Sequence, residues 1–403
     1  MLTESFRQLW RMRINRNHLV VYVLTFGVFS ILNTEMGVIG ILPLISDHFQ
    51  VSISAAGLIV SLFALAVAIS GPILPPLFSG INRKKMMLFV LGIFIVGNIV
   101  SAITSDFAVL LIARVVPAFF HPIYCSMAFT VAAASVNRDD VSKAVAKVFI
   151  GVSAGMVLGV PVTSMIASAA SLAYAMLFFA VVNTFAFIVT LLFVPSMPVA
   201  NKPSYGIQLR VLRRSAVWLS ISAVIFMNGA VFGVYSYLAE YLEIVTHLTW
   251  NTISLMLFLY GAANMVGNMI AGRLLTHHAL STIKRYPFVL GGVYILMLIL
   301  GQFSVPMVCM IVIWGVLGGI GGNITQYWIV ASAPDAPEFA NGIFLTSANL
   351  GTTIGASVCG LFITGMGAPY VLLGGILFVV LSVAAIYPKI LIEGRTEVAH
   401  DDR

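Results

Sequence analysis

Charged residues and cysteines are both scarce in this sequence. Asp, Glu, Lys and Arg together make up 9% of the 403 residues, against roughly 25% in an ordinary soluble domain. Hydrophobic residues make up 60%, which is more apolar surface than a soluble fold can bury, so lipid must surround most of the chain. Cys125, Cys309 and Cys359 lie singly in apolar runs, which argues against disulfides and a cysteine metal site.

Sequence motifs for nucleotide-driven or hydrolytic chemistry are also missing. No G-x-x-x-x-G-K-[ST] loop occurs, so the sequence predicts no ATP-driven engine. Gly151-Val-Ser153-Ala-Gly155 matches the G-x-S-x-G of serine hydrolases, but that motif needs a strand–turn–helix context and this one lies in an apolar run. His277 and His278 have no acidic or cysteine partners nearby. We therefore expect no catalytic residues, no metal site and no cofactor.

Long apolar runs are what the sequence has in place of charge. A membrane-spanning helix needs about 20 predominantly apolar residues, and runs of this kind alternate with clusters of charge, proline or glycine. The sequence therefore predicts an all-α membrane protein with twelve transmembrane helices. Their expected ranges are 19–45, 52–78, 86–104, 107–135, 144–168, 172–195, 215–239, 250–275, 286–303, 306–333, 339–365 and 368–391.

Positive charge lies almost entirely on one side of the predicted spans. If the N-terminus is inside, the cytoplasmic segments hold 20 of the 21 Lys and Arg residues, and the positive-inside rule then places both termini in the cytoplasm. The net charge of +7 is thereby explained by orientation in the membrane, and nucleic acid is not an expected partner. The basic residues on the cytoplasmic side are Arg7, Arg11, Arg13, Arg16, Arg83, Lys84, Lys85, Arg138, Lys143, Lys147, Lys202, Arg210, Arg213, Arg214, Arg273, Lys284, Arg285, Lys389, Arg395 and Arg403.

The longest polar link between spans divides the chain into two similar halves. We expect an N-terminal six-helix bundle with a short basic N-terminal segment at 1–195, a cytoplasmic linker at 196–214, and a C-terminal six-helix bundle with a short tail at 215–403. Gly155 and Gly159 of the fifth span recur as Gly351 and Gly355 of the eleventh, an offset of 196 positions. Internal repeats of this kind are common in secondary transporters.

Three motifs in the N-terminal half carry a resemblance to a known family. The loop after the second span reads Ser79-Gly-Ile-Asn-Arg83-Lys84-Lys85, with the family's basic cluster present and Ser79 standing where the family has Asp. The second motif is an intramembrane arginine, Arg114 in the fourth span, followed four residues later by a small residue. A charge within a span costs at least ~3 kcal/mol, so Arg114 is expected to face a cavity or an acid.

The third motif lies in the fifth span and reads Gly151-Val-Ser-Ala-Gly155-Met-Val-Leu-Gly159-Val-Pro161. Small residues four apart let two helix backbones approach closely, and the proline permits a bend. With these motifs the chain resembles the major facilitator superfamily, specifically the twelve-helix drug/proton antiporter branch that includes bacterial sugar-efflux, purine-efflux and chloramphenicol-resistance permeases. The resemblance implies a monomer in the bacterial inner membrane that works by alternating access.

In that reading the span-five motif and the basic loop support the conformational change. Substrate is expected to bind from the cytoplasm at the interface of the two halves. The residues assigned to this gating role are Gly151, Gly155, Gly159, Pro161, Arg83, Lys84 and Lys85.

Of the fourteen acidic residues, only Glu35 lies deep within a predicted span. It is ten residues from the external end of the first span, or ~15 Å, and Arg114 is seven residues from the external end of the fourth, or ~10 Å. His121 follows Arg114 by seven residues and shares its helical face. Because an apolar cavity favours the neutral acid and a nearby Arg favours the carboxylate, we predict Glu35 as the proton carrier, Arg114 as the charge that tunes it, and His121 as a relay. A static ion pair between two helices is the alternative.

The C-terminal half offers uncharged polar groups instead of a deep acid. Amides within spans commonly bridge helices, and together with aromatic side chains they can form a binding surface for a neutral or weakly polar molecule. The candidates for lining a substrate cavity are Asn33, Tyr124, Asn228, Tyr235, Asn264, Asn323, Gln326 and Asn349.

Taken with the resemblance, these features predict a secondary transporter, a proton-coupled efflux antiporter for a sugar, a nucleoside or purine, or a drug. Its partners would be the small-molecule substrate, protons and membrane lipids. An uptake symporter or a facilitator on the same scaffold is the alternative. A membrane-embedded enzyme is more remote, since it would need clustered His, Asp and Ser or metal ligands that the sequence does not have.

Overall fold

Helices make up almost all of the computed structural model, which describes residues 2–199, 206 and 210–401. No strand occurs in these ranges, so the predicted all-α class is confirmed. Contacts divide the chain into two compact units, Met1–Lys202 and Pro203–Arg403, called unit 1 and unit 2 below. Part of the predicted linker, residues 200–205 and 207–209 with Lys202, lies outside the described residues, as does Arg403.

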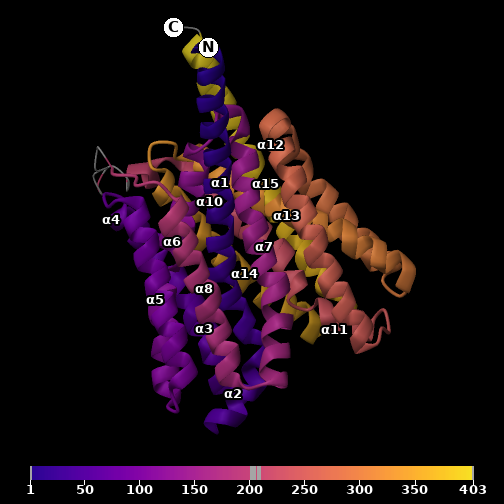
Figure 1. The fold of residues 1–403 in the computed structure, drawn as a ribbon. Coiled ribbons are helices and arrows are strands. Elements are labelled where there is room, and N and C mark those ends of the chain that lie inside the picture. Colours follow the sequence, from indigo (N-terminus) through magenta and orange to yellow (C-terminus); the bar gives the residue numbers. More distant parts are fainter. Residues whose placement is uncertain (1, 200–205, 207–209, 402–403) are drawn as a thin grey trace. The chain divides into compact units, whose positions relative to one another are not determined.

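Unit 1 is the indigo-to-magenta bundle of Figure 1. Its helices are α1 (Leu2–Gly37), η1 (Val38–Ile41), α2 (Leu42–Phe49), α3 (Ile53–Ser70), α4 (Leu74–Phe78), α5 (Arg83–Ile103), α6 (Phe107–Ala134), η2 (Arg138–Asp140), α7 (Val141–Ala169) and α8 (Leu172–Phe193).

Two of the spans predicted for unit 1 are broken. The first changes from α-helix to the 3₁₀ helix η1 after Gly37 and restarts as α2, with a proline at the start of α2. The second ends as α3 and restarts as α4, a helix that contains Pro75 and Pro76. Prolines lack the N–H that would continue a helix and clash with the preceding turn, so each restart follows from the sequence.

Unit 2 runs from orange to yellow in Figure 1. Its helices are η3 (Val211–Arg213), α10 (Ser215–Tyr235), α11 (Leu238–Ile244), α12 (Trp250–Leu300), α13 (Ser304–Ser332), α14 (Pro337–Met366), η4 (Ala368–Tyr370) and α15 (Val371–Asp401).

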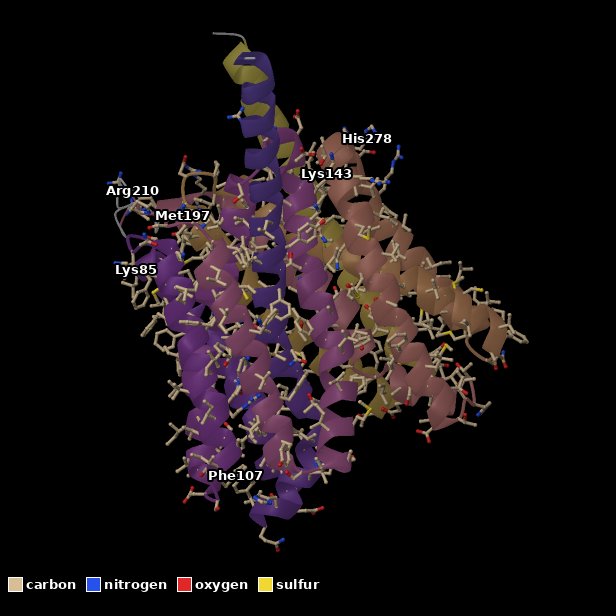
Figure 2. All side chains as sticks on the ribbon, in the orientation of Figure 1. Lys85, Phe107, Lys143, Met197, Arg210 and His278 are labelled. Atoms are coloured by element: carbon tan, nitrogen blue, oxygen red, sulfur yellow. The ribbon has the colours of Figure 1, made fainter. Side chains whose placement is uncertain are left out.

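Helix α12 corrects the prediction of a loop between the eighth and ninth spans. Residues 250–300 form one helix interrupted at His278, whose φ of −141° and ψ of 38° are not helical, and His278 lies at the bend (Figure 2). From Arg273 to Tyr286 the sequence has no glycine or proline, so nothing stops the helix between the two spans. At 1.5 Å per residue its 51 residues reach ~77 Å, more than twice the ~30 Å hydrocarbon core, so the kink separates two spans.

Ten helices of the described chain are long and apolar enough to cross a membrane. One of them is α12, which contains two of the predicted spans, and the shorter apolar helix Ala55–Ser70 falls in the predicted second span. These helices together account for the twelve predicted spans.

The glycines of the span-five motif place α7 directly against α1. A Cβ on Gly155 would lie 2.6 Å from the Leu32 Cβ and 3.0 Å from the Asn33 amide nitrogen, and one on Gly151 would collide with the Thr25 carbonyl oxygen. Unit 2 repeats this contact, because a Cβ on Gly351 of α14 would collide with the Ile225 carbonyl of α10. The repeated glycines therefore serve the same close helix packing in both units.

We expect Gly155→Leu to destabilise the folded protein by about 3 kcal/mol, the upper range for overpacking a rigid contact. Backbone atoms of α1 block the new side chain and cannot move away. The matched control is Gly57→Leu, since a Cβ at Gly57 meets no atom within 4 Å. Thermal melting of the detergent-solubilised variants measures the difference, and equal melting temperatures would contradict the packing described.

Candidate functional site

Arg114 is buried in unit 1 and held by groups from two other helices. Its side chain is 2% exposed. Its Nη2 donates to the Thr34 carbonyl oxygen of α1 at 2.6 Å, and its Nη1 donates to the Asn98 Oδ1 of α5 at 3.2 Å. The guanidinium also lies 5.5 Å from the centre of the Phe179 ring of α8. Several polar contacts thus replace the water that a buried cation loses.

Side-chain amides and hydroxyls continue the hydrogen bonding from Asn98 and Thr34 to α8. The Thr34 Oγ1 accepts from the Asn183 Nδ2 at 2.8 Å and from the Asn98 Nδ2 at 3.5 Å, and Ser30 donates to the Asn183 Oδ1 at 3.3 Å. We call Ser30, Thr34, Asn98, Arg114 and Asn183 the Arg114 network. The sequence analysis missed Asn98 and Asn183, although each is a lone amide in an apolar span, the same signal that flagged the amides of unit 2.

Glu35 contacts His121 and not Arg114. The Glu35 Oε2 lies 3.6 Å from the His121 Nε2, whereas no ion pair within 4 Å joins the two described side chains of Glu35 and Arg114. Of the three residues of the predicted proton site, Glu35 and His121 are therefore in contact, while Arg114 bonds to the carbonyl of Thr34, the residue before Glu35.

His121 lies between the acid and a thiol. Its Nε2 is 3.4 Å from the Cys125 Sγ, one helical turn further along α6. Among the described residues, no group of three His, Cys, Asp or Glu side chains is placed to hold a metal ion. The Glu35 Oε2 and the His121 Nδ1 have no hydrogen-bond partner, so both retain an acceptor or donor for exchange.

Exposure distinguishes Glu35 from the residues around it. Its side chain is 11% exposed and that of His121 is 4% exposed, while Arg114 is 2% exposed. Glu35 therefore has the most exposed side chain of the three, although its Oε2 is buried. A partly exposed acid can bind and release a proton while a nearby buried cation, held by fixed contacts, stays in place.

The two cavity candidates of unit 1 are both buried. Asn33 is 1% exposed, and neither its Oδ1 nor its Nδ2 has a hydrogen-bond partner. Tyr124 is fully buried, with its hydroxyl against Gly27, where any Cβ would collide with it. Asn33 lies beside Gly159, one of the predicted gating residues, whereas Tyr124 fills space between helices.

Two of the five amides predicted for unit 2, Asn323 and Gln326, bridge helices. The Asn323 Nδ2 of α13 donates to the Asn268 Oδ1 of α12 at 2.8 Å, and the Asn268 Nδ2 lies 3.5 Å from the Asn264 Oδ1. The Gln326 Nε2 donates to the Asn341 Oδ1 of α14 at 2.8 Å. By contrast, the side chains of Asn228 and Asn349 donate to backbone carbonyls of their own helices, at 3.0 and 2.9 Å.

Tyr235 belongs to an aromatic cluster in the core of unit 2. Its ring centre lies 4.7 Å from that of Tyr260 and 6.3 Å from that of Trp314, and Tyr260 and Trp314 are 4.9 Å apart. Tyr294 fixes the cluster, because its hydroxyl accepts from the Trp314 Nε1 at 3.1 Å and donates to the Ala230 carbonyl at 2.7 Å. Tyr235 therefore packs in a cluster of tilted and edge-on aromatic rings.

Lys389, one of the basic residues predicted for the cytoplasmic side, is buried. It is 1% exposed. Its Nζ donates to the Ser332 Oγ at 2.6 Å and lies 3.6 Å from the centre of the Trp328 ring. The aromatic face and the hydroxyl satisfy the ammonium. The sequence analysis missed this because residue order places Lys389 near a span end but does not give its direction about the helix axis.

The predicted basic loop joins the start of α5 to the last turn of α8 by hydrogen bonds. The Lys84 Nζ donates to the Leu191 carbonyl at 2.7 Å, which suits the negative end of the α8 dipole. The Arg83 amide donates to the Met197 carbonyl at 3.3 Å. Lys85 and Met197 mark this end of unit 1 in Figure 2, and Phe107 marks the opposite end.

Comparison with known proteins gives consistent matches along most of the chain. Residues 24–356 match the sequence profile of the Major Facilitator Superfamily. The chain is 31% identical over 353 residues to the uncharacterized MFS-type transporter YtbD of Bacillus subtilis, covering 85% of this chain and 88% of the relative. It is 27% identical to the inner membrane transport protein YdhP of Escherichia coli K12, with coverage of 86% and 90%.

A probable sugar efflux transporter of Helicobacter pylori (strain 26695) is 26% identical, with coverage of 87% of this chain and 90% of the relative. Among solved structures, the human organic anion transporter MFSD10 superposes with a TM-score of 0.76 at 17% identity, covering 92% of this chain and 99% of that chain. At this identity the structural match concerns the fold.

Proposed function

This chain belongs to the Major Facilitator Superfamily, and we propose that it is a proton-coupled efflux antiporter for a small neutral or weakly polar molecule. Its relatives are membrane transporters and not enzymes, so the chain is a multi-pass membrane transporter. Proton coupling and the outward direction of transport are our proposal and go beyond membership of the family. The observation that carries the proposal is the contact of 3.6 Å between Glu35 and His121 beside the Arg114 network.

In the proposed cycle, Glu35 alternates between carboxylate and neutral acid. Facing outward, it takes up a proton as the substrate leaves, and facing inward, it releases that proton as the next substrate binds. The gradient favours uptake outside and release inside, so each proton that enters drives substrate out. His121 relays the proton over the 3.6 Å to the carboxylate. The positive charge of Arg114 stabilises the ionised form of Glu35.

Two features support export of a neutral molecule. A relative with 26% identity is named a probable sugar efflux transporter, and the glycine motif of α7 resembles that of the antiporter branch. The site holds one acid and one arginine, so its charge is close to zero when both are ionised. That balance disfavours a strongly cationic substrate and suits a sugar, a nucleoside or purine, or an uncharged drug.

We further propose the bacterial inner membrane as the location, with both termini in the cytoplasm and a monomer as the working form. The charge pattern supports the orientation, and a relative with 27% identity is named an inner membrane transport protein. Both residues of the ion pair between Arg214 and Asp335, at 2.7 Å, belong to segments on the proposed cytoplasmic side.

Transport in everted membrane vesicles tests the direction and the coupling. With the vesicle interior made acidic, we expect radiolabelled substrate from a panel of sugars, nucleosides and chloramphenicol to accumulate inside vesicles containing this protein. A proton uncoupler should remove the accumulation. If substrate instead moves out of everted vesicles under the same gradient, the protein is an uptake symporter, and if the gradient has no effect it is a facilitator.

A further inference from the structure

A groove runs along the surface of unit 1 between α5 and α6. Its volume is about 610 Å³, and all eleven residues that line it have non-polar side chains. Large apolar residues on its rim are exposed, with Phe89 at 52%, Val96 at 62% and Ile112 at 62%. These helices lie in the predicted membrane-spanning region, so the groove faces hydrocarbon.

Gly92 keeps this groove open, and helix packing does not explain its presence. A Cβ at Gly92 would meet no atom within 4 Å, whereas one at Gly97, also in the lining, would meet the Pro117 side chain at 2.7 Å. A glycine within a helix is less stable than an alanine. Gly97 is therefore required by the contact of α5 with α6, while Gly92 leaves an empty space.

The length of the groove matches one leaflet of a bilayer. Its lining on α5 extends from Phe89 to Val100, which is ~16 Å along a helix and about half of a ~30 Å hydrocarbon core. Val100 lies three residues before the end of α5, and Val109 lies near the start of α6. The groove thus reaches the end of unit 1 that Phe107 marks in Figure 2, which the charge pattern assigns to the outside.

We propose that this groove binds one acyl chain of an outer-leaflet phospholipid with an ethanolamine headgroup. A sugar or nucleoside would leave its hydroxyls without partners against an apolar lining, whereas a hydrocarbon chain needs none. Asp106 lies three residues before the lining residue Val109 and is exposed, with its Oδ1 accepting from the Ala108 and Val109 amides, and in the described residues of unit 1 this end carries no Lys or Arg. A headgroup with an ammonium suits that charge better than an anionic phosphatidylglycerol.

The bound chain would contact the back of the Arg114 network. The inner wall of the groove includes Gly97 and Ala113, and the next residues in sequence, Asn98 and Arg114, are joined at 3.2 Å. A chain packed against this wall stabilises the α5–α6 pair on which that bond depends. The assignment to the outer leaflet rests on the proposed orientation in the membrane, whereas lipid binding itself does not depend on the proposed transport activity.

Photolabelling of the full-length protein in nanodiscs tests the proposal. The probe is phosphatidylethanolamine with a diazirine near the end of one acyl chain. Trypsin cleaves after Lys85 and Arg114, so the peptide Met86–Arg114 contains most of the groove. We expect strong labelling of this peptide, several-fold less labelling in Gly92→Phe and in Val96→Trp, and competition by unlabelled phosphatidylethanolamine but not by phosphatidylglycerol.

The control is Gly292→Phe on α12. A Cβ at Gly292 also meets no atom within 4 Å, and the residue does not line the groove, so labelling of Met86–Arg114 should equal that of the wild type. Val96→Trp adds its bulk at an exposed position, which keeps the test valid if Gly92→Phe folds poorly. Equal labelling in the wild type and both filled variants would overturn the site, and equal competition by phosphatidylglycerol would overturn the headgroup assignment.

Discussion

Proton-driven efflux is expected to fall to background, at least ~10-fold, when Glu35 is replaced by Gln. Glutamine keeps the shape and polarity of the side chain but cannot exchange a proton. The variant should still fold, because the Glu35 carboxylate contributes no hydrogen bond to the Arg114 network. Accumulation of substrate in everted vesicles under a pH gradient measures the loss, normalised to the amount of folded protein.

Two comparisons make the Glu35 result specific. Glu338→Gln changes another buried acid, in the first turn of α14, and should retain the response to the pH gradient. Exchange of labelled for unlabelled substrate without a gradient should survive in Glu35→Gln if only the coupling is lost. Unchanged gradient-driven accumulation in Glu35→Gln would remove Glu35 from the mechanism.

Replacing Arg114 by Met should destabilise the protein by about 3 kcal/mol and abolish coupled transport. The change leaves the Thr34 carbonyl and the Asn98 Oδ1 without their donor, and a buried acceptor without a partner costs roughly 1–3 kcal/mol. It also removes the charge that we propose tunes Glu35. The melting temperature of the purified variant reports the first effect, and vesicle transport reports the second.

Arg114→Lys separates charge from geometry in the same assay. Lysine keeps the positive charge, but its single ammonium cannot reproduce the planar fork that reaches two helices. We therefore expect part of the stability and part of the pH response to return. If Arg114→Met melted and transported like the wild type, the Arg114 network would not have the role described.

The sequence predicted the membrane-spanning helices, because these follow from the lengths of the apolar runs. It also placed Arg114 and His121 on one face of α6, which the helical period determines. It did not predict that Glu35 would contact His121. The depth estimate treated the first span as one straight helix, whereas α1 gives way to η1 after Gly37, and the rotation of a helix about its axis depends on packing.

Helix rotation, which the sequence does not give, also explains why the burial of Lys389 was not predicted. A lysine near a span end can point to solvent or inward, and only the packing of α15 against Trp328 and Ser332 decides which. Asn98 and Asn183 were detectable as isolated amides in apolar runs. Their partner Thr34, whose carbonyl also accepts from Arg114, was not detectable in this way. A threonine in a span usually hydrogen-bonds to its own helix, so its presence does not indicate a contact between helices.

The central claim is that Glu35 is the group that exchanges a proton for substrate. The most direct test is to measure proton release when substrate identified in the vesicle screen binds to purified protein in weakly buffered solution near neutral pH. If protonation and substrate binding exclude each other, linkage predicts release of up to about one proton per substrate bound by the wild type and none by Glu35→Gln. Equal release by the two proteins would contradict the account.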